Sequence, residues 1–196
     1  LELEIEKFLT ERETQPLSEF EAEVAQHDSL TAKVEIDLPG ALAKEQENAR
    51  KNREYAKTAA NLSVQLGKDE DYTGAEKQKQ KSIELTEEAA GYDQKALSLE
   101  AEMITLKDNL RKSLDSINEH KSLEKRAKVE MERLTKESKN ASERMDFTTA
   151  KLYTSHREAY KALLDRFSNT SVRKYNAKKK AEKEAEAARK KAEKEA

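Results

Sequence analysis

The sequence predicts an all-α, elongated protein, built as an antiparallel helical hairpin or coiled coil with one very long C-terminal helix. Charged residues make up 40% of the 196 residues and hydrophobic ones only 35%, too little for a thick core. The chain has only four Gly and two Pro, few for the many turns of a β-sandwich or a doubly wound sheet. Disorder is disfavoured because the net charge is only −2 and the apolar residues recur with a helical period.

The few breakers divide the N-terminal third. A short helix is expected over residues 1–14, before Pro16, because its apolar side chains share one face: Leu1, Ile5, Phe8 and Leu9. Residues 16–66 are expected to form a helical arm. A kink is expected near 37–40, where Pro39 and Gly40 follow each other.

Residues 67–74 form the clearest turn signal. Gly67 suits the position just past a helix, where the backbone is left-handed. Asp69, Asp71 and Thr73 can cap the helix that follows. A short turn between two long helices predicts an antiparallel hairpin.

A long coiled-coil helix is expected over residues 75–170. Of 23 positions in a strict 3,4 ladder from Leu85 to Ala162, 17 are apolar, where a 35% background gives about 8. The predicted helix–helix seam is Leu85, Tyr92, Leu99, Met103, Leu106, Leu110, Ile117, Met131, Leu134, Met145 and Leu152. A second stripe predicts another interface: Tyr153, Tyr160, Leu164 and Phe167. The pattern leaves open whether the helix breaks near residues 138–142.

Charge is uneven along the chain. Residues 1–40 carry 11 acids and 3 bases, a net of −8, and residues 171–196 carry 10 bases and 5 acids, a net of +5. The second segment reads as a low-complexity helical tail. Its bases are solvated, meet an acidic chain end, or contact an anionic surface; the candidates for that contact are Arg173, Lys174, Lys178, Lys179 and Lys180.

The motifs of catalysis are missing from the sequence. Without Cys there is no thiolate chemistry, and no Gly-rich phosphate loop is present. His120 and Glu124 have the spacing of a metal pair, but they lie on the ladder and read as a polar layer that fixes register. We therefore expect no enzyme, cofactor, metal or small-molecule substrate. No nucleic acid is expected, because the basic tail has a single aromatic residue, Tyr175, too few for a row of bases to stack on.

Residues 16–66 carry an apolar–His motif, a Pro-containing kink and a run of charged helix, PLSEFEAEVAQHDSLTAKVEIDLPGALAKEQENARKNREYAK. In this order of features the segment resembles helical membrane-remodelling modules of the BAR and F-BAR type. The resemblance implies a dimer that presents basic residues to anionic, curved membranes.

Two functions follow from these patterns. The first is a non-enzymatic structural coiled-coil protein, a rod, spacer or scaffold that acts through helix–helix association; the alternative is a BAR-like dimeric membrane module. The stripe between Ala127 and Phe167 has no evident partner unless the chain folds back near residue 140. We therefore expect a homodimer, parallel or antiparallel, or a place in a larger assembly. The expected location in the cell is the cytoplasm, with the cytoskeleton or a membrane surface as alternatives. Because residue 1 is Leu and not Met, we also expect a processed chain or a segment of a longer one.

Overall fold

The computed structural model describes residues 1–195, and these are all-α with no strand among them. The helices are α1 (Glu2–Thr14), α2 (Leu17–Ala32), the π-helix η1 (Lys33–Asp37), α3 (Leu38–Lys68), α4 (Tyr72–Glu143), α5 (Phe147–Arg166), the 3-10 turn η2 (Phe167–Asn169) and α6 (Ser171–Glu195). The chain divides into two compact units. Unit 1 comprises Leu1–His27 and the chain from Ser113 onward, and unit 2 comprises Asp28–Lys112.

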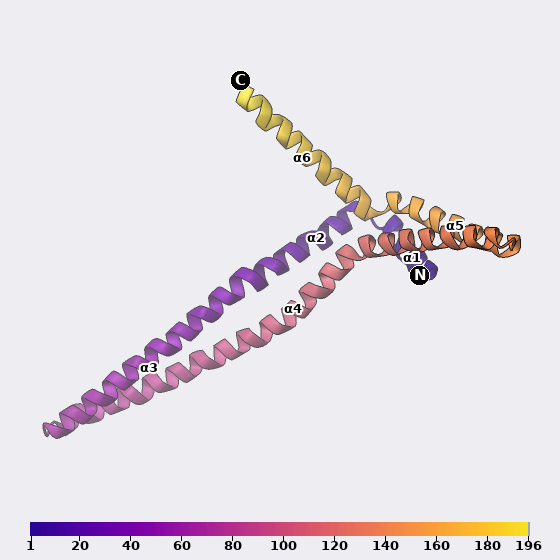
Figure 1. Ribbon diagram of the computed structural model, residues 1–196. Helices are drawn as coiled ribbons and strands as arrows, with labels where there is room; N and C mark the ends of the chain where they lie inside the picture. The colour runs from indigo at the N-terminus through magenta and orange to yellow at the C-terminus, as the bar shows by residue number, and fades with distance from the viewer. Residues whose placement is uncertain (196) are drawn as a thin grey trace. The chain divides into compact units, whose positions relative to one another are not determined.

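Unit 2 is an antiparallel helical hairpin. Figure 1 shows α3 and the first part of α4 running side by side. The fully buried side chains between them are mostly alanines: Ala49, Ala56 and Ala59 on α3, and Ala89 and Ala96 on α4. Hydroxyls cross the hairpin to backbone carbonyls, from Ser63 Oγ to Ala75 O at 2.7 Å and from Ser82 Oγ to Ala56 O at 2.9 Å. The two backbones therefore approach closely, which small side chains permit.

Near residues 37–40, where a kink is expected, the chain stays helical and a π segment, η1, precedes Leu38. The Leu38 N–H donates to Lys33 O, five residues back, instead of four. Pro39 has no N–H and its ring would crowd the carbonyl four residues back in a regular helix. A π turn is a known way to absorb such a mismatch, and α3 continues helical from Leu38 with Pro39 in its first turn.

Unit 1 is a helical bundle with its own core. Figure 1 shows α5 lying along the last part of α4. Ser138 Oγ on α4 lies 3.1 Å from Ala150 O and 2.9 Å from Thr154 Oγ1 on α5. Helix α1 adds the third layer, and the core comprises Ile5, Phe8, Leu9, Leu123, Ala127, Leu134, Tyr160 and Phe167.

The prediction of one long helix over residues 75–170 was wrong, because the structure has two helices there, α4 and α5, and a 3-10 turn. Helix α4 ends at Glu143 and α5 begins at Phe147, so the chain reverses at residues 144–146. The reversal lies just after residues 138–142, the range in which the sequence pattern leaves a break open. The expected tail over 171–196 is α6 as far as Glu195, and residue 196 lies outside the described residues.

Both reversals use the same turn. After α3, Asp71 N donates to Leu66 O and Glu70 N to Gly67 O; after α4, Asp146 N donates to Ala141 O and Met145 N to Ser142 O. This is the Schellman pattern of helix ends, with Glu70 (φ 61°) and Met145 (φ 59°) left-handed. Gly67 is helical, so the prediction that it takes this conformation was wrong.

The aspartate after each left-handed residue caps the next helix. Asp71 Oδ1 accepts from Gly74 N at 2.9 Å, and Asp146 Oδ1 accepts from Thr149 N at 3.1 Å. The turn expected over 67–74 thus narrows to residues 69–71, because capping by Asp71 begins α4 at Tyr72.

Met145→Gly should raise the free energy of unfolding by about 0.5–1 kcal/mol. Glycine adopts a left-handed backbone without the steric cost that Met145 bears, although it loses more chain entropy on folding. The Met145 side chain is 79% exposed, so its removal sacrifices no packing. Urea titration monitored by circular dichroism measures the change, with Met145→Ala as the control that keeps the strain. A glycine variant less stable than the alanine variant would contradict this assignment.

Candidate functional site: the helix–helix seams

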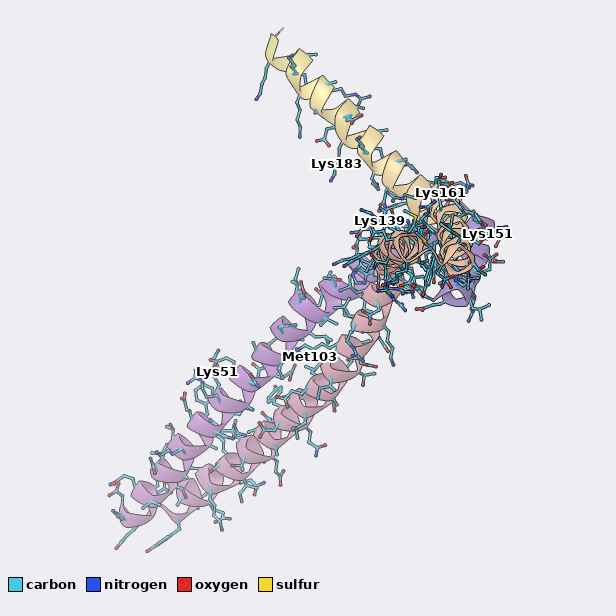
Figure 2. All side chains as sticks on the ribbon, turned by 45° about the vertical axis from the view of Figure 1, so that its right-hand side comes forward. Lys51, Met103, Lys139, Lys151, Lys161 and Lys183 are labelled. Carbon is cyan, nitrogen blue, oxygen red and sulfur yellow. The ribbon has the colours of Figure 1, made fainter. Side chains whose placement is uncertain are left out.

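The part of the predicted seam that lies in unit 2 faces the hairpin partner but is only half-buried. It comprises Leu85, Tyr92, Leu99, Met103, Leu106 and Leu110. Figure 2 labels Met103 on α4, on the side that faces the opposite arm of the hairpin. The alanines fill the centre of the contact and the larger side chains border it. Two helices cannot enclose a core completely, so these larger side chains keep part of their surface in solvent.

Of the predicted seam residues in unit 1, some are buried and others are exposed. Leu134 is buried, and Ile117 and Met131 are half-buried. Met145 and Leu152 are exposed, by 79% and 55%, and do not belong to a seam. Met145 occupies the left-handed turn position. The turn resets the helical phase, so Leu152 falls on the outer side of α5.

The second predicted interface lies inside unit 1. Tyr160 and Phe167 are buried in the core, and Tyr153 and Leu164 pack against it. Their partners come from α4 and from α1 of the same chain. The chain therefore covers this stripe itself, and the argument that it needs a second copy loses its premise.

The ladder missed a central residue, Leu123. It is 1% exposed, whereas Glu124, which the ladder selected, lies at the border of the contact and pairs with Lys128 and Arg173. The buried positions run His120, Leu123, Ala127, still spaced three and four apart. A ladder counted backward from Ala127, first by four residues and then by three, selects Leu123 and His120, the positions that are buried.

Ion pairs tie the acidic N-terminal segment to the rest of unit 1. Arg166 on α5 makes paired hydrogen bonds of 2.7–3.1 Å with Glu6 and Glu13 on α1. The hydrogen bonds from Arg166 hold the pKa of Glu13 below its usual value. Arg126 on α4 binds Glu4 at 2.7 Å. The acidic end thus meets basic residues of its own chain.

Arg12 on α1 makes a largely enclosed ion pair in unit 1. It is 8% exposed, and its Nη1 binds both oxygens of Glu23 on α2 at 2.9 and 3.0 Å. Its Nη2 donates to Ser116 on α4, and the guanidinium lies 5.4 Å from the ring centre of Phe20. No sequence pattern indicates this contact, because an Arg on an acidic helix face is ordinary.

His120 occupies a buried position on α4 and makes no hydrogen bond. It is 2% exposed, and both ring nitrogens are buried without a partner. Its ring lies 5.2 Å from that of Phe167 and 6.3 Å from that of Phe8. Burial, assisted by the charge of Arg173, holds the pKa of His120 below its ordinary value; the carboxylate of Glu124, 3.8 Å away, acts in the opposite direction.

Acidification should destabilise unit 1 through His120. Its pKa is lower in the folded state, so the unfolded chain binds the proton more readily. The stabilisation is complete above the unfolded pKa of about 6.5 and is lost as the pH falls toward the folded pKa. The loss between about pH 7.5 and 5.5 is at most about 1.4 kcal/mol, the limit set by protonation of the unfolded chain. Urea titrations at both values, compared with His120→Phe, measure it; equal pH dependence in the two proteins would contradict the assignment.

The predicted anionic-surface residues of α6 are all exposed, but most of them make ion pairs. Arg173 binds Glu124 and Lys178 binds Glu21, both across helices of unit 1. Lys179 and Lys180 pair along α6 with Glu182 and Glu184. These last two ion pairs are exposed and lie within α6, the helix that also carries Lys183, labelled in Figure 2.

Among residues 1–195, no group of three or more His, Cys, Asp or Glu side chains is placed to hold a metal ion. In the same part of the chain, no helix is long and apolar enough to cross a bilayer. Comparison with family models, with curated proteins and with solved structures found no match. The proposals below therefore rest on the geometry alone.

Proposed function

We propose that this chain is a non-enzymatic structural protein, a rod or spacer that acts through helix–helix association. The observation that carries the proposal is the hairpin of unit 2. Its helix α3 has 31 residues, which at 1.5 Å per residue gives an arm of about 46 Å. Its cysteine-free sequence is compatible with a reducing compartment, and the cytoplasm is the compartment we propose.

The hairpin has the features of a stiff element. The short capped turn at residues 69–71 fixes one end, and the alanine contact continues along both helices. Ion pairs and hydrogen bonds join the arms at successive levels: Asn52 with Glu88, Arg53 with Asp93, and Lys33 with Glu102. The last pair lies far from the turn, so the arms stay together over most of their length.

A distance measurement within unit 2 tests the proposal. Nitroxide labels at Lys44→Cys and Lys95→Cys, both exposed positions far from the turn, report whether the arms remain paired. A stiff hairpin gives one narrow distance of about 25 Å or less, because packed helix axes lie 8–10 Å apart. Labels at Lys57→Cys and Lys81→Cys, nearer the turn, provide the control. A broad distribution at the far pair alone would overturn the rod proposal.

Sedimentation with vesicles separates this function from that of a BAR-like module. Vesicles of anionic phospholipid should leave the protein in the supernatant, because acidic side chains lie beside most of the basic residues expected to face them and reduce the local positive charge. Salt-sensitive cosedimentation with these vesicles, absent with neutral ones, would favour the membrane module instead.

A further inference from the structure

Helix α4 in unit 2 carries a second apolar line, outside the hairpin seam, whose side chains are exposed in the described part of the chain. It consists of Ile83, Ala90, Leu97 and Ile104, each seven residues after the last. The three large side chains are 43%, 62% and 72% exposed, and Ala90 is exposed too. A repeat of seven keeps side chains in one line along a supercoiled helix, as one of the two apolar positions of a coiled-coil heptad does.

This line is separate from the seam of the hairpin. Ala90 and Leu97 each directly follow a buried seam alanine, Ala89 and Ala96. One residue turns a helix by about 100°, so the line points away from α3. The hairpin therefore has one internal helix–helix contact and a second apolar face on α4 that is exposed to solvent.

Both ends of the line are charged, with opposite signs. Glu76 precedes Ile83 by seven residues, and Arg111 follows Ile104 by seven. Their side chains are 71% and 72% exposed. Each now makes only an ion pair along α4, with Lys79 and with Asp108, of the weak exposed kind that can exchange partners.

We propose that this line, from Glu76 to Arg111, binds the same line of a second copy of the chain in an antiparallel, two-fold contact. The inference rests on the proposed function and names its partner. Antiparallel pairing places Glu76 of each copy opposite Arg111 of the other. It places Ile83 opposite Ile104, and the small Ala90 opposite the large Leu97, so that volumes also match. A two-fold contact makes each of these matches twice.

Parallel pairing matches the charged ends and the Ala90 and Leu97 volumes less well. Parallel pairing sets Glu76 against Glu76, Arg111 against Arg111, and Leu97 against Leu97. Among flanking residues, antiparallel pairing brings Lys79 to Asp108, which is favourable. It also brings Glu87 to Glu100, two like charges, but both are exposed and salt screens their repulsion. The 36 residues from Glu76 to Arg111 give an overlap of about 54 Å.

Sedimentation equilibrium of the full chain tests the surface. The chain should associate as a dimer, and Leu97→Lys should weaken the dimer about tenfold or more, because a charge then enters the contact. Val129→Lys is the matched control: Val129 is 57% exposed on the same helix but lies in unit 1, outside the line. Circular dichroism checks that each variant folds.

A charge exchange tests the orientation. Arg111→Glu should weaken the dimer about fivefold, since surface ion pairs are individually weak and two are reversed. Adding Glu76→Arg should restore the affinity, because each new Arg then faces a new Glu in the other copy. A double variant as weak as the single one would overturn the antiparallel pairing.

Single cysteines give an independent readout, since the chain has none of its own. A chain with Ile83→Cys mixed with one carrying Ile104→Cys should give the mixed disulfide dimer, and neither chain alone should cross-link. Cross-linking of each chain with itself would show the parallel pairing. A dimer that Leu97→Lys does not weaken would overturn the proposal that this line forms the contact, but it would leave the proposed rod function intact. A monomeric chain whose nitroxide distances across the hairpin stay narrow would likewise overturn the dimer contact and leave the rod function.

Discussion

Leu123→Ala should lower the free energy of unfolding of unit 1 by about 2–5 kcal/mol, the cost of truncating a fully buried leucine. Leu123 is 1% exposed and belongs to the core shared by α1, α4 and α5. Removing its side chain leaves a cavity where three helices meet, and such a site can close only in part.

Leu152→Ala is the matched control. The sequence ladder includes Leu152 and omits Leu123, whereas the structure leaves Leu152 55% exposed. Its truncation should cost less than about 0.5 kcal/mol, as surface substitutions do. Guanidinium titrations of both variants decide between the ladder and the structure: a greater loss for Leu152→Ala would show that the ladder is right and that α5 does not pack as described.

Arg12→Ala should cost about 2–3 kcal/mol. Removing one partner of an enclosed ion pair leaves the other charge without compensation, which typically costs 3–5 kcal/mol when both are buried. The value is lower here because the Glu23 side chain remains 36% exposed. The variant also loses the contact of the guanidinium with Phe20 and the hydrogen bond to Ser116.

The exposed pair of Arg126 with Glu4 provides the comparison for Arg12. Its side chains are 50% and 47% exposed, so Arg126→Ala should cost at most about 1 kcal/mol. Thermal unfolding followed by circular dichroism measures both variants under the same conditions. Equal losses would mean that Arg12 acts as an ordinary surface charge and does not join α1 to α2 and α4.

The all-α fold class and the first hairpin were predictable from the sequence because both depend on local patterns. Apolar spacing of three and four residues identified the helices, and the acidic cluster with Gly67 identified the turn near residue 70. The second reversal has neither signal. Met145 takes the left-handed position usually held by Gly, and the capping Asp146 lies within a long charged helix pattern where an Asp is common.

The core of unit 1 was less predictable because its partners are distant in sequence. A ladder assumes one continuous partner, which holds for the alanine contact in unit 2. Around Leu123 the partner is α1, more than a hundred residues earlier, so the buried face of α4 shifts by one position. His120 was expected to be a polar layer and lies in that position, but its aromatic neighbours Phe8 and Phe167 come from elements that no local pattern connects to it.

The reversal at residues 144–146 is the claim on which the account depends, because it encloses the apolar stripe within one chain. Ser138 Oγ and Thr154 Oγ1 lie 2.9 Å apart across α4 and α5, close enough for a disulfide when both residues are replaced by cysteine. In an uninterrupted helix the same two residues are about 24 Å apart and cannot be bridged within a chain. Oxidised Ser138→Cys/Thr154→Cys protein should therefore run as a monomer with no free thiol; disulfide-linked dimers, or thiols that stay reduced, would contradict the fold.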